Sequence, residues 1–409
     1  MQGRMLLFGL AALLAACAQG PRVSLEAGSV PPAIERPFAT FREAALAFDV
    51  EAARRLAATD AERDYARALG LVRDGELPQS QAELLTLATG ADSRIAAMAR
   101  GLVALVAHGG VTPERAAFTS EVDRSFAEWL HRFTAEEKRS IPAQGTTVTF
   151  TRGATDTPLV PVTLNGFGTV LGLDTGAHMT VLGSLLADAV GARRLGSRTA
   201  AKDVHEATVE AELAIVDLEI GGVRLEGHPV VIVDASNLRF GVAGKGDTGF
   251  DGLIGWNAIR ELRVEIDNGA RTIRFAPSKG GTSPQGDLFW IGEPHVRARA
   301  GNGFPLTLFI DTGASRTTIA TTLAAPAGLA GGEARSTVVF GAAGSRRLDM
   351  TAYRDVVLYA GGTRLRFPEL QALAPRATSF SLRDGVLGAD ALSEGFITID
   401  YPAREFSIR

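Results

Sequence analysis

The sequence predicts a mainly β region of two similar lobes related by a pseudo-twofold axis, preceded by a small all-α domain of helical hairpins. Three observations support this prediction. A motif and its flanking residues occur twice, the chain after Pro142 reads as alternating strands and hairpins, and the chain before it reads as helices. With 409 residues, the chain is long enough for two or three domains.

The composition excludes several classes of function. A hydrophobic content of 46% and a net charge of −4 describe an ordinary globular protein, and no basic stripe indicates nucleic-acid binding. The six histidines are scattered and lack a cysteine partner, so we expect no metal site and no cofactor. No Gly-x-Ser-x-Gly nucleophile motif is found.

Residues 1–16 are predicted to be a lipoprotein signal peptide. Arg4 precedes an apolar run that is too short to span a bilayer. The run ends in Leu-Ala-Ala-Cys17, which resembles the bacterial lipobox, in which the peptide is cut before a cysteine that then receives a lipid. Cys17 is the only cysteine, so no disulfide can form within the chain. The alternatives are an uncleaved anchor and a plain signal peptide.

Residues 17–36 contain the lipidated Cys17 and then a stretch rich in Pro, Gly and Ser, which we interpret as a tether. Ala18 rather than Asp follows the cysteine. By resemblance to sorted lipoproteins, this favours a lipid anchor in the outer membrane of a bacterial envelope, facing the periplasm.

Residues 37–140 are predicted to be helical, because Ala, Leu and Arg dominate and apolar residues recur every three or four positions. The short helices and tight turns resemble tetratricopeptide repeats, and a small bundle without a repeat is the alternative. We expect a protein partner to bind this domain. Helix start and stop signals lie at Asp60, Pro78, Asp92, Gly75, Gly90 and Gly109.

Two copies of one pattern fill the rest of the chain, at 147–276 and 287–409, with a linker at 277–286. Residues 164–182 align without a gap with residues 301–319, and both contain Asn-Gly-Phe followed by Asp-Thr-Gly-Ala. Each copy continues with a related Asp-Gly-apolar-apolar-Gly segment and closes with a strand hairpin. This repeat predicts two lobes of the same architecture.

Asp174 and Asp311 open the two Asp-Thr-Gly-Ala motifs. If the lobes pack about a pseudo-twofold axis, these carboxylates meet, and two carboxylates about 3 Å apart share one proton instead of both ionising. The ionised member can deprotonate a water, and the protonated member can donate to a carbonyl oxygen. The pair is therefore suited to general acid–base hydrolysis of an amide.

The residues after each aspartate are expected to support the catalytic turn. The threonines can hydrogen-bond across the axis, the glycines let the backbone bend close to the carboxylates, and the alanines lack a hydroxyl that could donate to them. Without that donor the pair should keep its shared proton to higher pH, with an optimum at about pH 5–6. These supporting residues are Thr175, Gly176, Ala177, Thr312, Gly313 and Ala314.

The motifs resemble the retropepsin-like aspartic peptidases, with two units fused in one chain, over about Thr147 to Arg409. The resemblance implies an aspartic-peptidase fold, hydrolysis of peptide bonds in a protein or peptide substrate, and no cofactor. It also implies a hairpin flap in each lobe, for which the candidates are 197–213 and 336–352. The expected substrate-binding residues are His178, Ser315, Gly341 and Gly344.

We expect an aspartic endopeptidase anchored in the bacterial envelope. One alternative is a non-catalytic peptide-binding or scaffold lipoprotein that retains the fold, but a binder has no need of two intact Asp-Thr-Gly motifs. A further alternative is that each copy pairs with its counterpart in another chain. The short linker and the different residues at 178 and 315 favour pairing within one chain.

Overall fold

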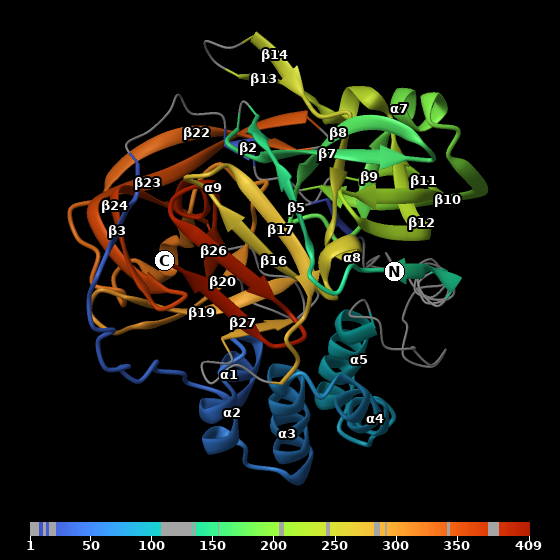
Figure 1. Ribbon diagram of the computed structural model, residues 1–409. Coiled ribbons are helices and arrows are strands. Elements are labelled where there is room, and N and C mark those ends of the chain that lie inside the picture. Colours follow the sequence, from blue (N-terminus) through green and yellow to red (C-terminus); the bar gives the residue numbers. More distant parts are fainter. Residues whose placement is uncertain are drawn as a thin grey trace.

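The computed structural model describes residues 8–10, 14–15, 22–107, 133, 136–153, 155–203, 208–242, 246–281, 287–290, 293–341, 344–374 and 384–409. Two β lobes lie side by side with a further sheet between them, and a group of helices lies beneath (Figure 1). This is the mainly β, two-lobed architecture that the sequence predicts.

The helices follow the capping signals of the sequence. Thr59 and Glu62 form a reciprocal capping box at the start of the third helix, and Gly75 ends it in a left-handed conformation with φ of 82°. The Asp92 side chain accepts backbone N–H groups at the start of the fifth helix. The helices are α1 (Phe41–Leu46), α2 (Val50–Leu56), α3 (Asp60–Asp74), α4 (Leu77–Ala88) and α5 (Ser93–Ala107).

The helical region has its own apolar core, and that core includes a residue of lobe 2. Phe289 is buried among the helices and stacks on Phe48, with ring centroids 5.6 Å apart. The helices are therefore docked on the β region and do not form an independent module.

Lobe 1 lies to the right in Figure 1. Its strands are β4 (Lys138–Ser140), β6 (Thr151–Arg152), β7 (Pro158–Leu164), β8 (Phe167–Leu173), β9 (Thr180–Gly183), β10 (Arg193–Asp203), β11 (Thr208–Ile220), β12 (Val223–Val233), β13 (Arg239–Val242), β14 (Gly246–Gly249) and β15 (Gly252–Ile254). Its short helices are α7 (Ser184–Ala189), η2 (Ala235–Leu238) and α8 (Trp256–Ile259).

Lobe 2 lies to the left. Its strands are β18 (Leu288–Trp290), β19 (Pro294–Ala300), β20 (Pro305–Ile310), β21 (Thr318–Ala320), β22 (Glu333–Gly341), β23 (Gly344–Ala360), β24 (Thr363–Leu373) and β25 (Gly385–Leu387). Its short helices are η3 (Thr321–Leu323) and α9 (Ala389–Leu392).

The two lobes repeat one strand order. Lobe 1 runs β10–β11–β12–β9–β15–β8–β7, and lobe 2 runs β22–β23–β24–β21–β25–β20–β19. In both lobes the strand before the aspartate, β8 or β20, pairs in parallel with the short strand of the Asp-Gly segment, β15 or β25. The internal repeat of the sequence is thus a structural duplication.

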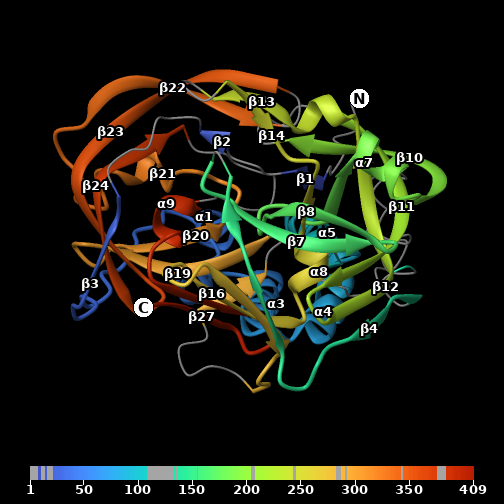
Figure 2. The same ribbon diagram turned by 45° about the horizontal axis from the view of Figure 1, so that its top comes forward.

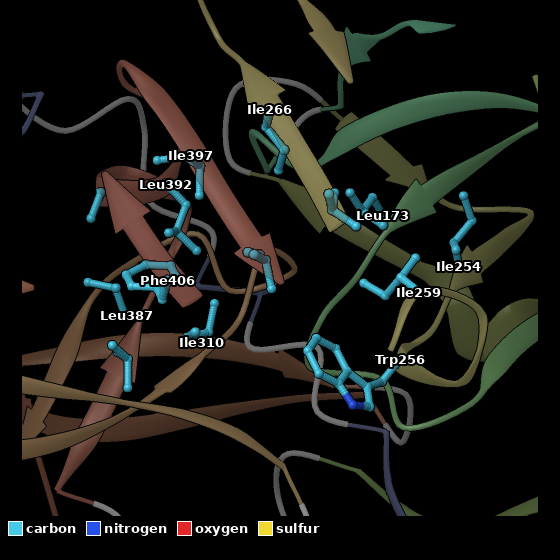
Figure 3. Close-up of a cluster of buried hydrophobic side chains, with 14 of the residues drawn as sticks. Leu173, Ile254, Trp256, Ile259, Ile266, Ile310, Leu387, Leu392, Ile397 and Phe406 are labelled. Carbon is cyan, nitrogen blue, oxygen red and sulfur yellow. The ribbon is translucent and has the colours of Figure 1, made fainter. Parts of the chain in front are cut away.

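The closing hairpins of the two copies join in a sheet between the lobes. Its strands are β5 (Thr146–Thr149), β16 (Leu262–Asp267), β17 (Thr272–Pro277), β26 (Phe396–Asp400) and β27 (Glu405–Ile408). β16 and β26 pair antiparallel, with Val264 opposite Ile399. Apolar side chains from both lobes and this sheet form one continuous core, which includes Leu173, Ile266, Ile310 and Ile397 (Figure 3).

Both predicted flap segments are antiparallel hairpins. β10 pairs with β11 in lobe 1, and β22 pairs with β23 in lobe 2, where Gly341 faces Gly344 at the turn. Figure 2 shows the β22–β23 hairpin arching over the molecule towards the β13–β14 hairpin. There Phe340 of lobe 2 contacts Phe240 of lobe 1, with ring centroids 6.0 Å apart.

Residues 22–36 are not the free tether that their composition suggests. The strand β3 (Ser24–Glu26) pairs with β24, the Ile34 N–H donates to the carbonyl of Gly303, and Arg36 forms an ion pair with Asp384. We call this segment the strap. It runs down lobe 2 to α1 (Figure 1), because its backbone finds partners along a strand edge that would otherwise be open.

Two predicted boundaries need correction. Residues 138–140, which we assigned to the helical domain, form β4 and pair with β12, so lobe 1 begins earlier than expected. The linker at 277–286 begins with residues that are held in place, since Ser278 and Lys279 both hydrogen-bond Asp400. Residues 282–286 lie outside the described part of the chain.

Of the predicted signal peptide, the structure describes only the backbone of two short strands. β1 (Phe8–Leu10) pairs with β10, and β2 (Leu14–Ala15) pairs with β22. Cys17 lies outside the described residues. Among the helices that the structure describes, none is long and apolar enough to cross a membrane.

Candidate active site

Asp174 and Asp311 follow the ends of equivalent strands. The strands β8 and β20 end at Leu173 and Ile310, both fully buried, and the two aspartates are themselves 0% exposed. The strand residues before Asp174 are not all buried, because Val170 is 47% exposed. The start of β8 is exposed, whereas both faces of its last three residues, Leu171 to Leu173, are buried.

The threonines tie the two turns together, as the sequence predicts. The Thr175 N–H donates to Thr312 Oγ1, and the Thr312 N–H donates to Thr175 Oγ1, each at 3.0 Å. The Thr175 hydroxyl donates to the Ile310 carbonyl at 2.9 Å, and the Thr312 hydroxyl donates to the Leu173 carbonyl at 2.6 Å. Since all four bonds cross between lobes, the two copies pair within one chain.

The two carboxylates meet at this junction. A Cβ added to Gly313 would lie 2.6 Å from Asp174 Oδ1, so the Asp174 carboxylate of lobe 1 lies directly against the turn of lobe 2. Gly176 N–H donates to Asp174 Oδ1, and Gly313 N–H donates to Asp311 Oδ1, each at 2.8 Å. The other oxygen of each carboxylate, Oδ2, is buried and accepts no hydrogen bond from a backbone N–H, a hydroxyl or an amide in the described part of the chain.

Burial and mutual repulsion shift the titration of this pair. Burial raises the pKa of Asp174 to about 6, although the Gly176 N–H, Asp311 and the Ala177 N–H oppose the shift. Burial and then the charge of Asp174 raise the pKa of Asp311 well above its ordinary value, against the N–H groups of Ala314 and Gly313. As the pH rises through about 6, the pair therefore passes to the singly protonated state that acid–base hydrolysis requires.

A loop packs behind each turn and holds it. The N–H of Asp174 donates to the Ile254 carbonyl, and the N–H of Asp311 donates to the Leu387 carbonyl. The glycine after each of these carbonyl residues has no room for a side chain, because a Cβ on Gly255 would lie 2.1 Å from the Met179 carbonyl carbon. These two loops are the Gly-apolar-apolar-Gly parts of the Asp-Gly segments that the sequence repeats in both copies.

The four predicted substrate-binding residues have different surroundings. His178 is half-buried; its ring packs against Trp290 with centroids 5.8 Å apart, and both of its ring nitrogens are buried. Ser315, at the equivalent place in lobe 2, is half-buried. Gly341 and Gly344 lie at the turn of the β22–β23 hairpin.

A set of polar residues behind the turns was not expected from the sequence. Thr180 and Asn257 in lobe 1 correspond to Thr317 and Asp390 in lobe 2, and each pair is joined by hydrogen bonds. The alignment of the two copies contained the signal, since it places a threonine at the same position in both. His228 also belongs to the set in lobe 1, but no sequence pattern distinguishes it from other histidines.

Comparison with known families agrees with this geometry. Residues 160–258 and 296–391 each match the family model described as aspartyl protease. The two matched segments are the two lobes, and each contains one of the paired aspartates. No characterised protein matches the chain closely enough to add to this comparison.

Proposed function

Because both lobes belong to the retropepsin-like aspartyl protease family, we propose that this protein is an aspartic endopeptidase and that Asp174 and Asp311 hydrolyse the peptide bond. The observation that carries the proposal is the buried pair of carboxylates, held by four threonine hydrogen bonds across the junction of the lobes.

In the proposed mechanism the pair starts with one shared proton. The ionised carboxylate removes a proton from a water, and the resulting hydroxide attacks the carbonyl carbon of the scissile bond. The protonated carboxylic acid donates to the carbonyl oxygen as the tetrahedral intermediate forms. Return of a proton to the amide nitrogen then allows the C–N bond to break, and the pair regains its single proton.

The pKa shifts favour this sequence near mildly acidic pH. With the pKa of Asp174 raised to about 6 and that of Asp311 raised well above its ordinary value, one carboxylate is ionised and the other protonated over a window that the ordinary values of aspartate would not give. A site that only held a peptide would not need this buried charge, which opposes folding at neutral pH.

We also propose that the protein acts at the bacterial envelope, anchored by a lipid on Cys17. The support is the sequence Leu14 to Cys17 after an apolar run. Cys17→Ser protein should keep its folded lobes and leave the membrane fraction, since a lipid is the anchor in this proposal. A Cys17→Ser protein that is processed and still sediments with membranes would contradict the anchor.

Catalysis is tested by incubating the purified protein with a denatured protein mixture and identifying cleavage products by mass spectrometry. The wild type should produce internal cleavages, and Asp174→Asn protein, whose fold is checked by circular dichroism, should produce none. Equal products from both proteins, or none from the wild type over the range pH 4–7, would exclude the proposed reaction and favour a peptide-binding function.

A further inference from the structure

A buried chain of polar side chains lies behind the catalytic turn of lobe 1. The Thr180 N–H donates to Asn257 Oδ1 at 2.7 Å, and the Thr180 hydroxyl oxygen lies 2.9 Å from His228 Nε2. The same hydroxyl oxygen accepts the Gly255 N–H at 3.3 Å. Thr180 and His228 are 0% exposed, so water does not compete for these bonds.

The outer half of this chain belongs to the segment that enters lobe 1. Glu137 Oε1 pairs with His228 Nδ1, and the other oxygen of Glu137 bonds Arg139. Arg139 Nη2 then donates to the backbone carbonyl of Asn257 at 2.6 Å, which closes the chain on itself. Because β4 contains Arg139, this strand is joined both to β12 and to the loop behind the turn.

The loop passes these contacts on to the catalytic turn. The N–H of Trp256 donates to the Ala177 carbonyl at 2.7 Å, and the N–H of Asn257 donates to the His178 carbonyl at 3.1 Å. Both acceptors lie directly after Asp-Thr-Gly. A displacement of Asn257 would therefore displace the backbone that orients Asp174.

In lobe 2 the equivalent turn is supported by a threonine and an aspartate, without a counterpart of His228. Asp390 Oδ1 accepts both the N–H and the hydroxyl of Thr317, at 2.8 and 2.6 Å, and the Gly388 N–H donates to the same hydroxyl oxygen. The strand registers place Pro368 where lobe 1 has His228. Proline has no side-chain donor or acceptor, so the equivalent position cannot continue the chain.

The arrangement of threonine, histidine and glutamate is that of a nucleophile with its base, but burial excludes this role. Thr180 is 0% exposed and bonded on all sides, so its hydroxyl cannot reach a substrate. With the His228 proton on Nδ1 toward Glu137, Nε2 accepts the Thr180 hydroxyl proton. A second proton on the ring would force that hydroxyl to turn to Asn257 Oδ1.

The charges around His228 are those of Glu137, Arg139 and Arg260. Burial lowers the pKa of His228; Glu137 opposes the shift, and Arg139 and Arg260 add to it. Burial and the two arginines therefore favour the neutral ring, in which one nitrogen can accept a proton.

We propose that Glu137, His228 and Thr180 are positioning residues of the reaction, through which the segment that enters lobe 1 sets the placement of Asp174. The proposal rests on the proposed peptidase function. It assigns to lobe 1 a connection, between the catalytic turn and the chain that arrives from the helical region, that Pro368 interrupts at the equivalent position among the described residues of lobe 2.

The test uses full-length protein and one peptide chosen from the cleavage sites found in the denatured mixture. Glu137→Gln and Thr180→Val should each lower kcat about tenfold and leave KM within about twofold. Thr180→Ser, which restores the hydroxyl, should return kcat to near the wild-type value. Glu265→Gln is the matched control, because Glu265 also pairs with arginines, Arg263 and Arg274, but in the sheet between the lobes.

The pH profile separates positioning from a general loss of structure. Glu137→Gln removes the carboxylate that opposes the low pKa of His228, so the ring titration followed by NMR should move to lower pH. The acidic limb of kcat should change shape in the same variant. A kcat within about twofold of wild type in both Glu137→Gln and Thr180→Val, or an equal loss in Glu265→Gln, would overturn the proposal.

A second readout stays valid if the protein shows no peptidase activity. The side-chain carboxyl carbons of Asp174 and Asp311 can be titrated by NMR in the folded protein. Thr180→Val should shift the titration midpoint of the pair by about 0.5 pH units or more, and Glu265→Gln should not. No shift in Thr180→Val would refute the positioning role, whatever the wild-type activity.

Discussion

The two lobes form the same turn around their aspartates and support it by different means. The aspartate that opens the Asp-Gly segment shows this clearly. In lobe 1 this residue, Asp251, is exposed and pairs with the exposed Arg239, whereas in lobe 2 Asp384 is buried and pairs with Arg36 of the strap. Lobe 1 is joined to the rest of the chain through His228, and lobe 2 through the strap. The two lobes thus share the structure of the turn around the aspartate, and they differ in the contacts that connect this turn to the rest of the chain.

The largest expected effect is the loss of activity when either aspartate of the pair, to which each lobe contributes one, is replaced. Asp174→Asn and Asp311→Asn should each lower kcat/KM by a factor on the order of 10³ or more, and the double variant should be little worse, because members of one catalytic unit are not additive. The measurement is peptide cleavage by the two single variants and the double variant. Substantial activity in either single variant would mean that the lobes do not form one pair.

The next effect separates the lobes by their ion pairs. Arg36→Ala should lower the free energy of unfolding by about 3–5 kcal/mol, because it leaves the buried Asp384 without its partner. The guanidinium carbon of Arg36 also lies over two aromatic rings, 5.2 Å from the centroid of Phe38 and 5.7 Å from the centroid of Phe304. Arg239→Ala, the counterpart in lobe 1, should cost less than about 1 kcal/mol, since both members of the Arg239–Asp251 pair are exposed.

Chemical denaturation of the two arginine variants at pH 7 measures this difference. Equal losses of stability in Arg36→Ala and Arg239→Ala would show that the strap does not stabilise lobe 2 as its contacts indicate.

The carboxylate pair should make stability depend on pH in a stated direction. Its pKa values are raised in the folded protein, so its contribution to stability is present below the unfolded pKa and is lost as the pH rises through about 6. Asp311→Asn should remove this loss and stabilise the protein at pH 7 by on the order of 1–3 kcal/mol. Unfolding of both proteins at pH 4 and pH 7 tests the sign, and a less stable Asn variant at pH 7 would contradict it.

The smallest expected effect concerns the two buried alanines after the Asp-Thr-Gly motifs. Ala314→Ser adds a hydroxyl beside Asp311, and donation to the ionised carboxylate should move the acidic limb of kcat/KM downward by about 0.5–1 pH units. Ala177→Ser makes the same change in lobe 1. The wild-type optimum should lie at about pH 5–6, and an optimum below about pH 3 would show that another group governs the titration.

The sequence was sufficient for the features that a duplicated motif encodes. The two copies predict two lobes, the paired aspartates and the threonine contacts, because a repeated local pattern must adopt the same turn in each copy. The hairpins of residues 197–213 and 336–352 were expected only from the family resemblance, which implies a flap in each lobe.

What the sequence could not show depends on contacts between distant residues. His228 and Glu137 are 91 residues apart, and neither lies in a motif. The strap is similar, since its Pro- and Gly-rich composition is typical of a flexible tether, and its order comes from the edge of β24 and the buried Asp384. The His178 ring faces Trp290 for the same reason: a tertiary contact decides its direction.

With the proposed lipid on Cys17, the order of the strap would limit how far the protein can move from a membrane. A flexible tether over residues 17–36 would let the lobes move to about several nanometres from the membrane surface. Because the chain is held on lobe 2 from residue 22 onward, the stretch from the proposed lipid on Cys17 measures at most about 18 Å. The peptidase would then work at the bilayer surface, and segments of other proteins that leave the membrane would be its accessible substrates.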